Sequence, residues 1–198
     1  MNRKIALSAL SALTALGLMG AATFAYFSDA GASNNNIFAS GTLNLKLSDD
    51  SPETDQDTVS ASFSGSNLAP GGCTTTQQLR VKNSGTVAAD HIEIAAANTV
   101  TDVEPTAAPQ KIDSYLRFGV FNYNGSPITI PNASANGNAF QDLKDLADND
   151  VDNLALTDLN TNHNIDVQIC LDSSAPNEVQ GDSVDSDWTI TLNQNSSQ

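Results

Sequence analysis

Basic residues are scarce in this chain of 198 residues: 8 lysines and arginines stand against 23 aspartates and glutamates, a formal net charge of -15. Such a surface repels phosphate groups and anionic lipid, so we exclude nucleic acid as a partner. Among the polar residues, Glu, Lys and Arg, which favour helices, are few, and Asn, Ser and Thr, which favour turns, are many. With 39% hydrophobic residues, this composition favours one folded domain built of strands and turns.

Catalytic motifs are missing as well. A zinc protease of the commonest kind needs two histidines four residues apart on a helix, with a Glu between them. Here His91 and His163 are far apart, His91 falls in an expected strand, and no Gly-x-Ser-x-Gly motif is present. We therefore expect no enzyme, no catalytic residue and no small-molecule substrate, although residues distant in sequence can converge in a fold.

The first 25 residues have the layout of a secretory signal peptide. Two basic residues near the start precede an apolar stretch, Ile5–Ala22, and small residues flank Phe24. Cleavage after Ala25 would make Tyr26 the first residue and leave 6 basic against 23 acidic residues, a net charge of -17. No Cys follows the apolar stretch, which excludes lipoprotein processing. The alternative is an uncleaved anchor that continues to Phe27.

Beyond residue 36, short apolar runs alternate with turn formers, which is typical of an all-β domain. About eight strands in this length predict a two-layer, jelly-roll-like β-sandwich over residues 37–198. The expected strands are Thr42–Leu47, Thr58–Phe63, Gln78–Lys82, His91–Ala96, Tyr115–Tyr123, Pro127–Ile130, Ile165–Leu171 and Trp188–Leu192. Turns are expected at Pro70-Gly71-Gly72, Asn83-Ser84-Gly85 and Asn122–Gly125.

An insertion rich in Asn and Asp occupies residues 132–164. Apolar side chains recur at every third position over Ala139–Leu146, which predicts a short helix there. In that helix, Asp142, Lys144 and Asp145 are expected to face the solvent.

Three aspartates of the insertion alternate as the first ligands of a calcium loop do: Asp148, Asp150 and Asp152. The sixth position of such a loop is Asn153 rather than Gly, and the twelfth is Leu159 rather than Glu. We therefore expect no metal site of the EF-hand type. An irregular calcium site that adds Asp158 stays open, against a solvated acidic loop. Apart from this possible calcium, we expect no cofactor.

Three triplets match the acceptor pattern for N-glycosylation, at Asn124, Asn132 and Asn195. Such triplets are common in a chain this rich in Asn, so they matter only in a host that glycosylates.

Blocks near both ends of the chain carry the most specific pattern. They are the join of signal and first strand (Leu18–Asp29, Asn36–Leu45), a Pro-Gly turn before a strand with an Asn-x-Gly end (Asn67–Gly71, Leu79–Thr86), and a last loop with a closing strand (Asn177–Val184, Trp188–Leu192). Together they cover about half of the chain and closely resemble the TasA/camelysin family of secreted biofilm-matrix and pilus fibre subunits. A dedicated signal peptidase cuts the signal peptides of that family.

The resemblance implies a secreted jelly-roll subunit that polymerises head to tail with copies of itself, in a biofilm matrix or a surface pilus. In this mode, called donor-strand complementation, the mature N-terminus of one subunit adds a strand to a sheet of the next. The donor strand would be Tyr26, Phe27, Ser28, Asp29, Ala30, Gly31 and Ala32, tethered by residues 33–36. An apolar aromatic pair at a new chain end supports this, because docking removes it from water.

Other readings stay open beside the filament subunit. The N-terminal segment could fold back on its own sheet or be disordered, which would give a secreted surface protein that does not polymerise. A secreted protease is the third reading, since some camelysin relatives carry a metalloprotease label.

The chain has two cysteines, Cys73 just after the Pro-Gly turn and Cys170 in the penultimate expected strand. The oxidising environment of a secreted protein favours their pairing. Each adjoins a block that the family places in the sandwich, so we expect a disulfide between them. The alternative is two separate buried thiols.

Overall fold

The computed structural model describes residues 40–49, 54–60, 62–103, 111–133 and 137–195. They belong to a unit that begins at Ser40. The expected signal peptide, residues 1–25, and the expected donor strand with its tether, residues 26–36, lie outside the described residues.

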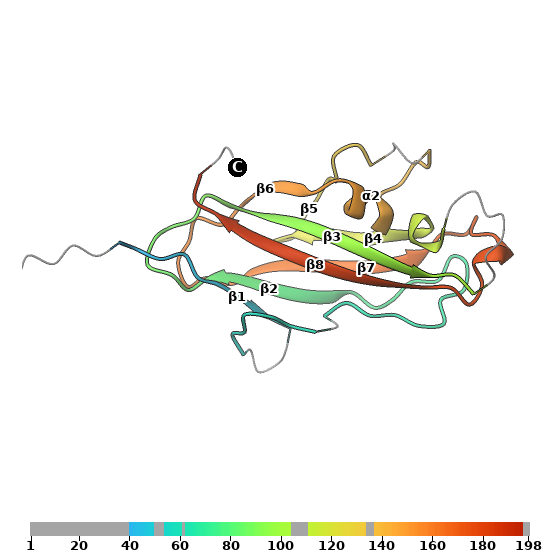
Figure 1. The fold of residues 1–198 in the computed structure, drawn as a ribbon, viewed down its shortest axis with the longest axis horizontal. Helices are drawn as coiled ribbons and strands as arrows, with labels where there is room; N and C mark the ends of the chain where they lie inside the picture. The colour runs from blue at the N-terminus through green and yellow to red at the C-terminus, as the bar shows by residue number, and fades with distance from the viewer. Residues whose placement is uncertain (1–39, 50–53, 61, 104–110, 134–136, 196–198) are drawn as a thin grey trace, which may run out of the picture. The chain divides into compact units, whose positions relative to one another are not determined.

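Two antiparallel sheets form this unit (Figure 1), which confirms the all-β sandwich. The larger sheet has the strand order β1-β2-β7-β4-β5, and the smaller has the order β6-β3-β8. The strands are β1 (Leu45–Ser48), β2 (Gln77–Asn83), β3 (His91–Thr101), β4 (Leu116–Tyr123), β5 (Ser126–Pro127), β6 (Val151–Ala155), β7 (His163–Leu171) and β8 (Ser183–Asn193). A short helix, α2 (Leu143–Asp148), and two 3-10 turns, η1 (Ile112–Ser114) and η2 (Asn177–Val179), complete the described elements.

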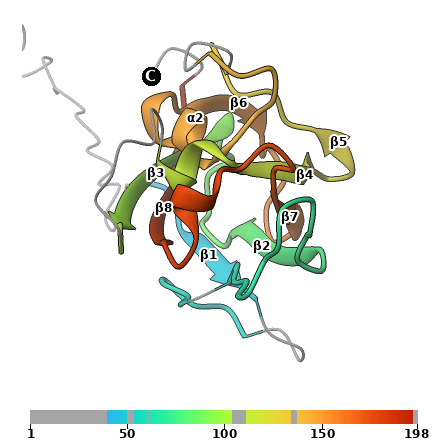
Figure 2. The same ribbon diagram turned by 90° about the vertical axis from the view of Figure 1, so that its right-hand side faces the viewer.

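The core lies between the two sheets, and the period-two alternation of each strand supplies it. Leu79 and Val81 of β2 meet Ile92 and Ile94 of β3 across the layers, and all four side chains are buried. Figure 2 shows β3 and β8 across from β4, β7 and β2. Each such aliphatic side chain contributes about 1.5–3 kcal/mol of burial free energy.

The prediction of a strand over Thr58–Phe63 is wrong, because the described residues of this segment form a loop. The outer side of β1 pairs with Gln56 alone, through hydrogen bonds of 2.8 and 2.9 Å between Leu47 and Gln56. The chain then leaves the sheet, and Val59 and Phe63 pack against the core.

The insertion holds a strand that the sequence pattern missed, β6, at the edge of the smaller sheet. Its sequence, Val-Asp-Asn-Leu-Ala, has no run of β-branched or aromatic residues, so its pairing with β3 decides its conformation. The strand expected over Pro127–Ile130 is nearly absent as well. Only Ser126–Pro127 is strand, because the Ile130 amide donates to the Gln141 side chain rather than to a neighbouring strand.

The expected helix exists but begins later, at Leu143. Two of the three residues expected to face the solvent are buried. Asp142 is the N-cap, and its Oδ1 accepts a hydrogen bond of 2.8 Å from the Asp145 amide, while the Asp145 carboxylate accepts one of 3.1 Å from the Asp142 amide. The two residues are 0% and 2% exposed. Burial and the neighbouring Asp142 raise the pKa of Asp145 to about 6. Capping thus outweighs the polarity pattern at this helix start.

The expected turns are confirmed by the backbone. Asn124 and Gly125 both adopt positive φ, 49° and 78°, in the hairpin between β4 and β5. Gly71 has φ 83° in the Pro-Gly turn. Asn83 is fully buried, and its side-chain oxygen accepts a 2.9 Å hydrogen bond from the Gly85 amide, which closes the turn after β2.

The expected disulfide joins Cys73 and Cys170. It links the segment before β2 to β7, and the bulge of β4 at Gly119 lies against it. A Cβ atom at position 119 would lie 2.6 Å from Cys170 Sγ, so this place in β4 requires a glycine.

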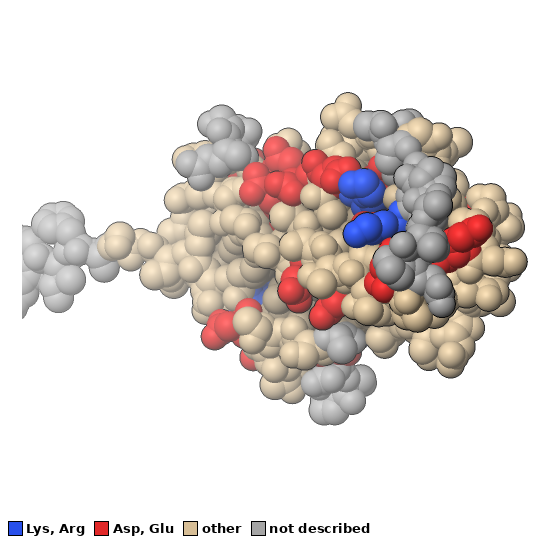
Figure 3. Space-filling view, turned by 45° about the vertical axis from the view of Figure 1, so that its right-hand side comes forward, with Lys and Arg blue, Asp and Glu red and all other residues tan. Residues whose placement is uncertain are grey.

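Acidic side chains gather in several groups on the face seen in Figure 3, where basic side chains cover less of the surface. This agrees with the excess of acidic residues in the sequence.

Candidate functional site

An apolar groove of about 1210 Å³ runs along β8, between the smaller sheet and the larger one. Its lining includes Leu45 and Leu47 of β1, Leu79 of β2, Ile169 of β7, and Trp188 and Ile190 of β8. Strands from both sheets therefore contribute to it, and it continues the core outward to the surface.

The inner face of β8 is incompletely covered. Val184, Ser186, Trp188, Ile190 and Leu192 alternate with exposed residues along this strand, but they are only half-buried. In β3, the middle strand of the same sheet, Ile92 and Ile94 are fully buried. The difference arises because the groove exposes the apolar face of β8 to solvent.

β8 is also the last strand of its sheet within the described part of the chain. It has 11 residues, with no Pro or Lys to block pairing. An edge of this kind presents unpaired amide and carbonyl groups to any extended chain that approaches it. The three-stranded sheet can therefore accept one more strand beside the groove.

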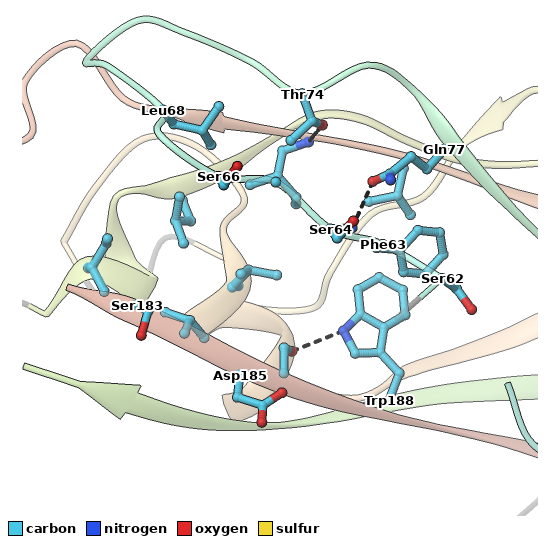
Figure 4. A pocket seen from close by; sticks show the side chains of 18 of the residues that line it. Ser62, Phe63, Ser64, Ser66, Leu68, Thr74, Gln77, Ser183, Asp185 and Trp188 are labelled. Atoms are coloured by element: carbon cyan, nitrogen blue, oxygen red, sulfur yellow. Dashed lines mark hydrogen bonds between the residues drawn. The ribbon is translucent and has the colours of Figure 1, made fainter. Parts of the chain in front are cut away.

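Aromatic residues close one end of the groove, where Figure 4 shows Phe63 and Trp188 side by side. Their ring centroids are 4.9 Å apart. The Trp188 indole N–H donates a 3.0 Å hydrogen bond to Ser186 Oγ, which holds the ring along the strand. The Ser64 amide donates to the Gln77 side chain at 2.9 Å and fastens the loop that carries Phe63 to β2.

A second cluster lies on the outer face of the smaller sheet. His91 and Glu93 flank the inward-pointing Ile92 on β3, so they point away from the core. Asp152 of β6 lies beside them, and the ligand atoms of the three residues lie within 4.8 Å of one another. Nitrogen and carboxylate oxygens at this spacing fit a divalent cation, which the sequence reasoning missed because β6 was not expected.

The His91 ring is held on both of its nitrogens and is only 2% exposed. Its Nδ1 lies 3.0 Å from Asp90 Oδ2, and its Nε2 lies 3.0 Å from Asp152 Oδ1. The side-chain nitrogen of Asn193, at the end of β8, lies 3.2 Å from Nε2.

The three aspartates considered for calcium separate in the structure. Asp148 forms an ion pair of 2.9 Å with Lys144 at the end of α2. Asp152 turns to His91 on β3, and Asp150 is exposed between them. Only Asp152 of the three thus belongs to the cluster that could hold a cation in the described residues.

His163 takes part in a separate buried contact. The Tyr123 hydroxyl lies 3.0 Å from His163 Nδ1 and donates to the Ala155 carbonyl at 2.9 Å. Burial, with a smaller contribution from Asp158, raises the pKa of Tyr123 above its usual range. The side chain of Asn124 lies 2.6 Å from the same ring nitrogen, so this glycosylation candidate is already engaged, whereas Asn132 and Asn195 are exposed.

A comparison with protein families decides what this chain is related to. The profile of the family described as camelysin metallo-endopeptidase matches residues 1–198. The chain belongs to the camelysin family. This confirms the resemblance of its terminal blocks. No curated protein matches the chain.

The description of the camelysin family implies a metal, and the two sites can be tested against it. The groove offers a surface suited to an extended peptide, but its lining contains no His, Cys or Glu and has only aspartates as potential metal ligands. The cluster of His91, Glu93 and Asp152 fits a cation, but it lies on the other face of the smaller sheet. A protease needs the metal and the peptide at one place. The donor set therefore fits a metal without fitting a peptidase centre.

No helix in the described ranges is long and apolar enough to cross a membrane.

Proposed function

We propose that this camelysin-family chain is a structural subunit of extracellular filaments, which polymerises by donor-strand complementation. The observation that carries the proposal is the free edge of β8 beside the apolar groove. The occupant would be Tyr26–Ala32 of a second copy, freed by a signal peptidase. Because one end of each subunit binds the groove of the next, the contact does not close on itself and produces a filament.

The groove and the donor segment match in chemistry and in length. A strand of seven residues spans about 23 Å, which fits along the 11 residues of β8. Ala30 and Ala32 would place small side chains against the groove at alternate positions. Tyr26, on the same face of the strand as Ala30 and Ala32, would gain about 2–3 kcal/mol on burial, and the backbone would pair with the edge of β8.

A bulky, charged substitution in the lining of the groove is expected to prevent assembly. Ser186 is half-buried on the groove face of β8, so Ser186→Lys places a long charged side chain where the donor strand would lie. We expect fibre yield, counted by negative-stain microscopy, to fall by more than about tenfold, because displacing or burying the ammonium group costs well over 1.4 kcal/mol.

The matched control is Thr191→Lys, which adds the same charge five residues away at an exposed position of β8 that does not line the groove. This variant is expected to form fibres as the unaltered protein does. Thermal unfolding of both variants checks that each one folds. Normal fibres from folded Ser186→Lys protein would contradict the proposal.

Assembly is expected to improve as salt rises. Packing subunits that each carry a charge of -17 concentrates like charge, and screening shortens the range of repulsion from about 10 Å at 0.1 M salt to about 3 Å at 1 M. Light scattering of the mature protein at increasing sodium chloride, with chelator present, measures the effect. Equal assembly at low and high salt would show that repulsion between subunits does not limit the process.

A secreted camelysin-like protease is the competing function, and the family description favours it. The separation of the cluster from the groove argues against it. We therefore propose that the chain does not cleave proteins, which casein turnover with and without chelator tests. Turnover that chelator abolishes would establish the competing function.

A further inference from the structure

We propose that His91, Glu93 and Asp152 bind one divalent ion of the zinc class, which fastens β6 to β3 as a structural site. The site is independent of the groove and of filament assembly, because it lies on the opposite face of the smaller sheet.

The contacts of His91 orient the Nε2 side of its ring toward the cluster. Asp90 Oδ2 lies 3.0 Å from Nδ1, so the ring donates its Nδ1–H to this carboxylate. The side-chain nitrogen of Asn193 lies 3.2 Å from Nε2. Asp152 Oδ1 lies 3.0 Å from the same ring nitrogen. With Nδ1 directed to Asp90, Nε2 is the ring atom positioned to bind a cation together with Asp152.

A carboxylate behind a ligating histidine is a recurrent feature of metal centres. Such a partner fixes the ring orientation and makes the ligating nitrogen more basic. Asp90 occupies this position, one residue before His91, and the His91 side chain is only 2% exposed to solvent. This second shell distinguishes the cluster from a group of acidic residues that merely share a surface.

The charge balance points the same way. The Glu93 side chain has no hydrogen bond or ion pair within the described part of the chain. Asp152 forms its ion pair with His91 and otherwise accepts hydrogen bonds only from the neutral Asn153 among the described residues. Two carboxylates thus meet at one imidazole. A divalent ion supplies the missing positive charge.

The mixed donor set selects the class of ion. Zinc accepts imidazole nitrogen together with Asp or Glu oxygen at about 2.0–2.2 Å, with four ligands in all. Calcium prefers six to eight oxygen ligands, so a site with one nitrogen and two carboxylates suits it poorly.

The position of the site in the sheet explains what the ion would do. β6 has only 5 residues, and its register with β3 is irregular between Ile92 and Ile94. This irregularity brings Asp152 beside Glu93. An ion held by residues from both strands would bridge the place where backbone pairing is weakest.

Calorimetric titration of the full chain with Zn²⁺, after dialysis against EDTA, tests the inference. We expect one tight equivalent for the unaltered chain, and binding weaker by more than about tenfold for Glu93→Gln. Glu178→Gln is the matched control: it makes the same change at an exposed residue of η2, beyond the opposite end of β8, and it is expected to bind as the unaltered chain does. Asp90→Asn, which keeps all three ligands, is expected to weaken binding by about 10- to 100-fold.

Two further measurements make the outcome decisive. Co²⁺ in place of Zn²⁺ is expected to give a visible absorption band that Glu93→Gln loses. Zn²⁺ is expected to raise the midpoint of thermal unfolding of the unaltered chain but not of Glu93→Gln. Equal binding by Glu93→Gln and Glu178→Gln, absence of a stoichiometric equivalent, or tighter binding of Ca²⁺ than of Zn²⁺ would overturn the inference.

Discussion

A mature chain produced without residues 26–32 is expected to fold as a soluble monomer and to form no fibres. The described core and the disulfide lie within residues 40–195, so we expect folding not to require the deleted segment. In the proposed mechanism assembly does require it, because the edge of β8 would then have no donor strand to pair with. Negative-stain microscopy and analytical ultracentrifugation of the truncated protein measure the two outcomes.

The control for this deletion removes residues 194–198, a segment of similar length that follows β8 at the other end of the chain. This shortened chain is expected to polymerise normally. A synthetic peptide with the sequence of residues 26–36 is expected to raise the unfolding temperature of the monomer that lacks 26–32, since it would occupy the groove. Ordinary fibres from the chain without residues 26–32 would rule out donor-strand assembly.

Replacing both Cys73 and Cys170 with serine is expected to lower the free energy of unfolding by about 4–5 kcal/mol. The bond joins residues 97 positions apart, and closing so long a loop removes much of the conformational entropy of the unfolded chain. Urea denaturation of the double variant, compared with the native protein, measures the loss.

The native protein itself provides the control for this change. Its thiols are expected to resist alkylation until reduction, which adds two hydrogens to the mass and makes both cysteines reactive. Free thiols in the native protein would contradict the bond. A stability loss below about 1 kcal/mol would show that the unfolded chain is already restricted by other means.

Strands with alternating apolar residues and turns built from turn-forming residues could be predicted from the sequence. β2, β4 and β7 have strong alternation, and the turns at Asn83-Ser84-Gly85 and Asn124-Gly125 depend on residues that make their own turns. The errors fall where a distant contact decided the conformation. The 58–63 segment has the composition of a strand, but of the described residues near it only Gln56 pairs with the outer side of β1, and the chain that follows lines the groove. Asp142 and Asp145 are polar, yet a reciprocal cap satisfies both of them in the interior.

The sequence by itself determined the class of fold, the position of most strands and turns, the two cysteines that pair, and membership of the camelysin family. These follow from period-two patterning, turn residues and motif blocks, which are local in the chain. Only the tertiary structure decided which strand is left at the edge of the smaller sheet and which face of β8 opens into a groove. It also decided that Asp152 meets His91 and Glu93, because β6 reaches β3 from about 60 residues away along the chain, and no local pattern encodes pairing between strands so far apart.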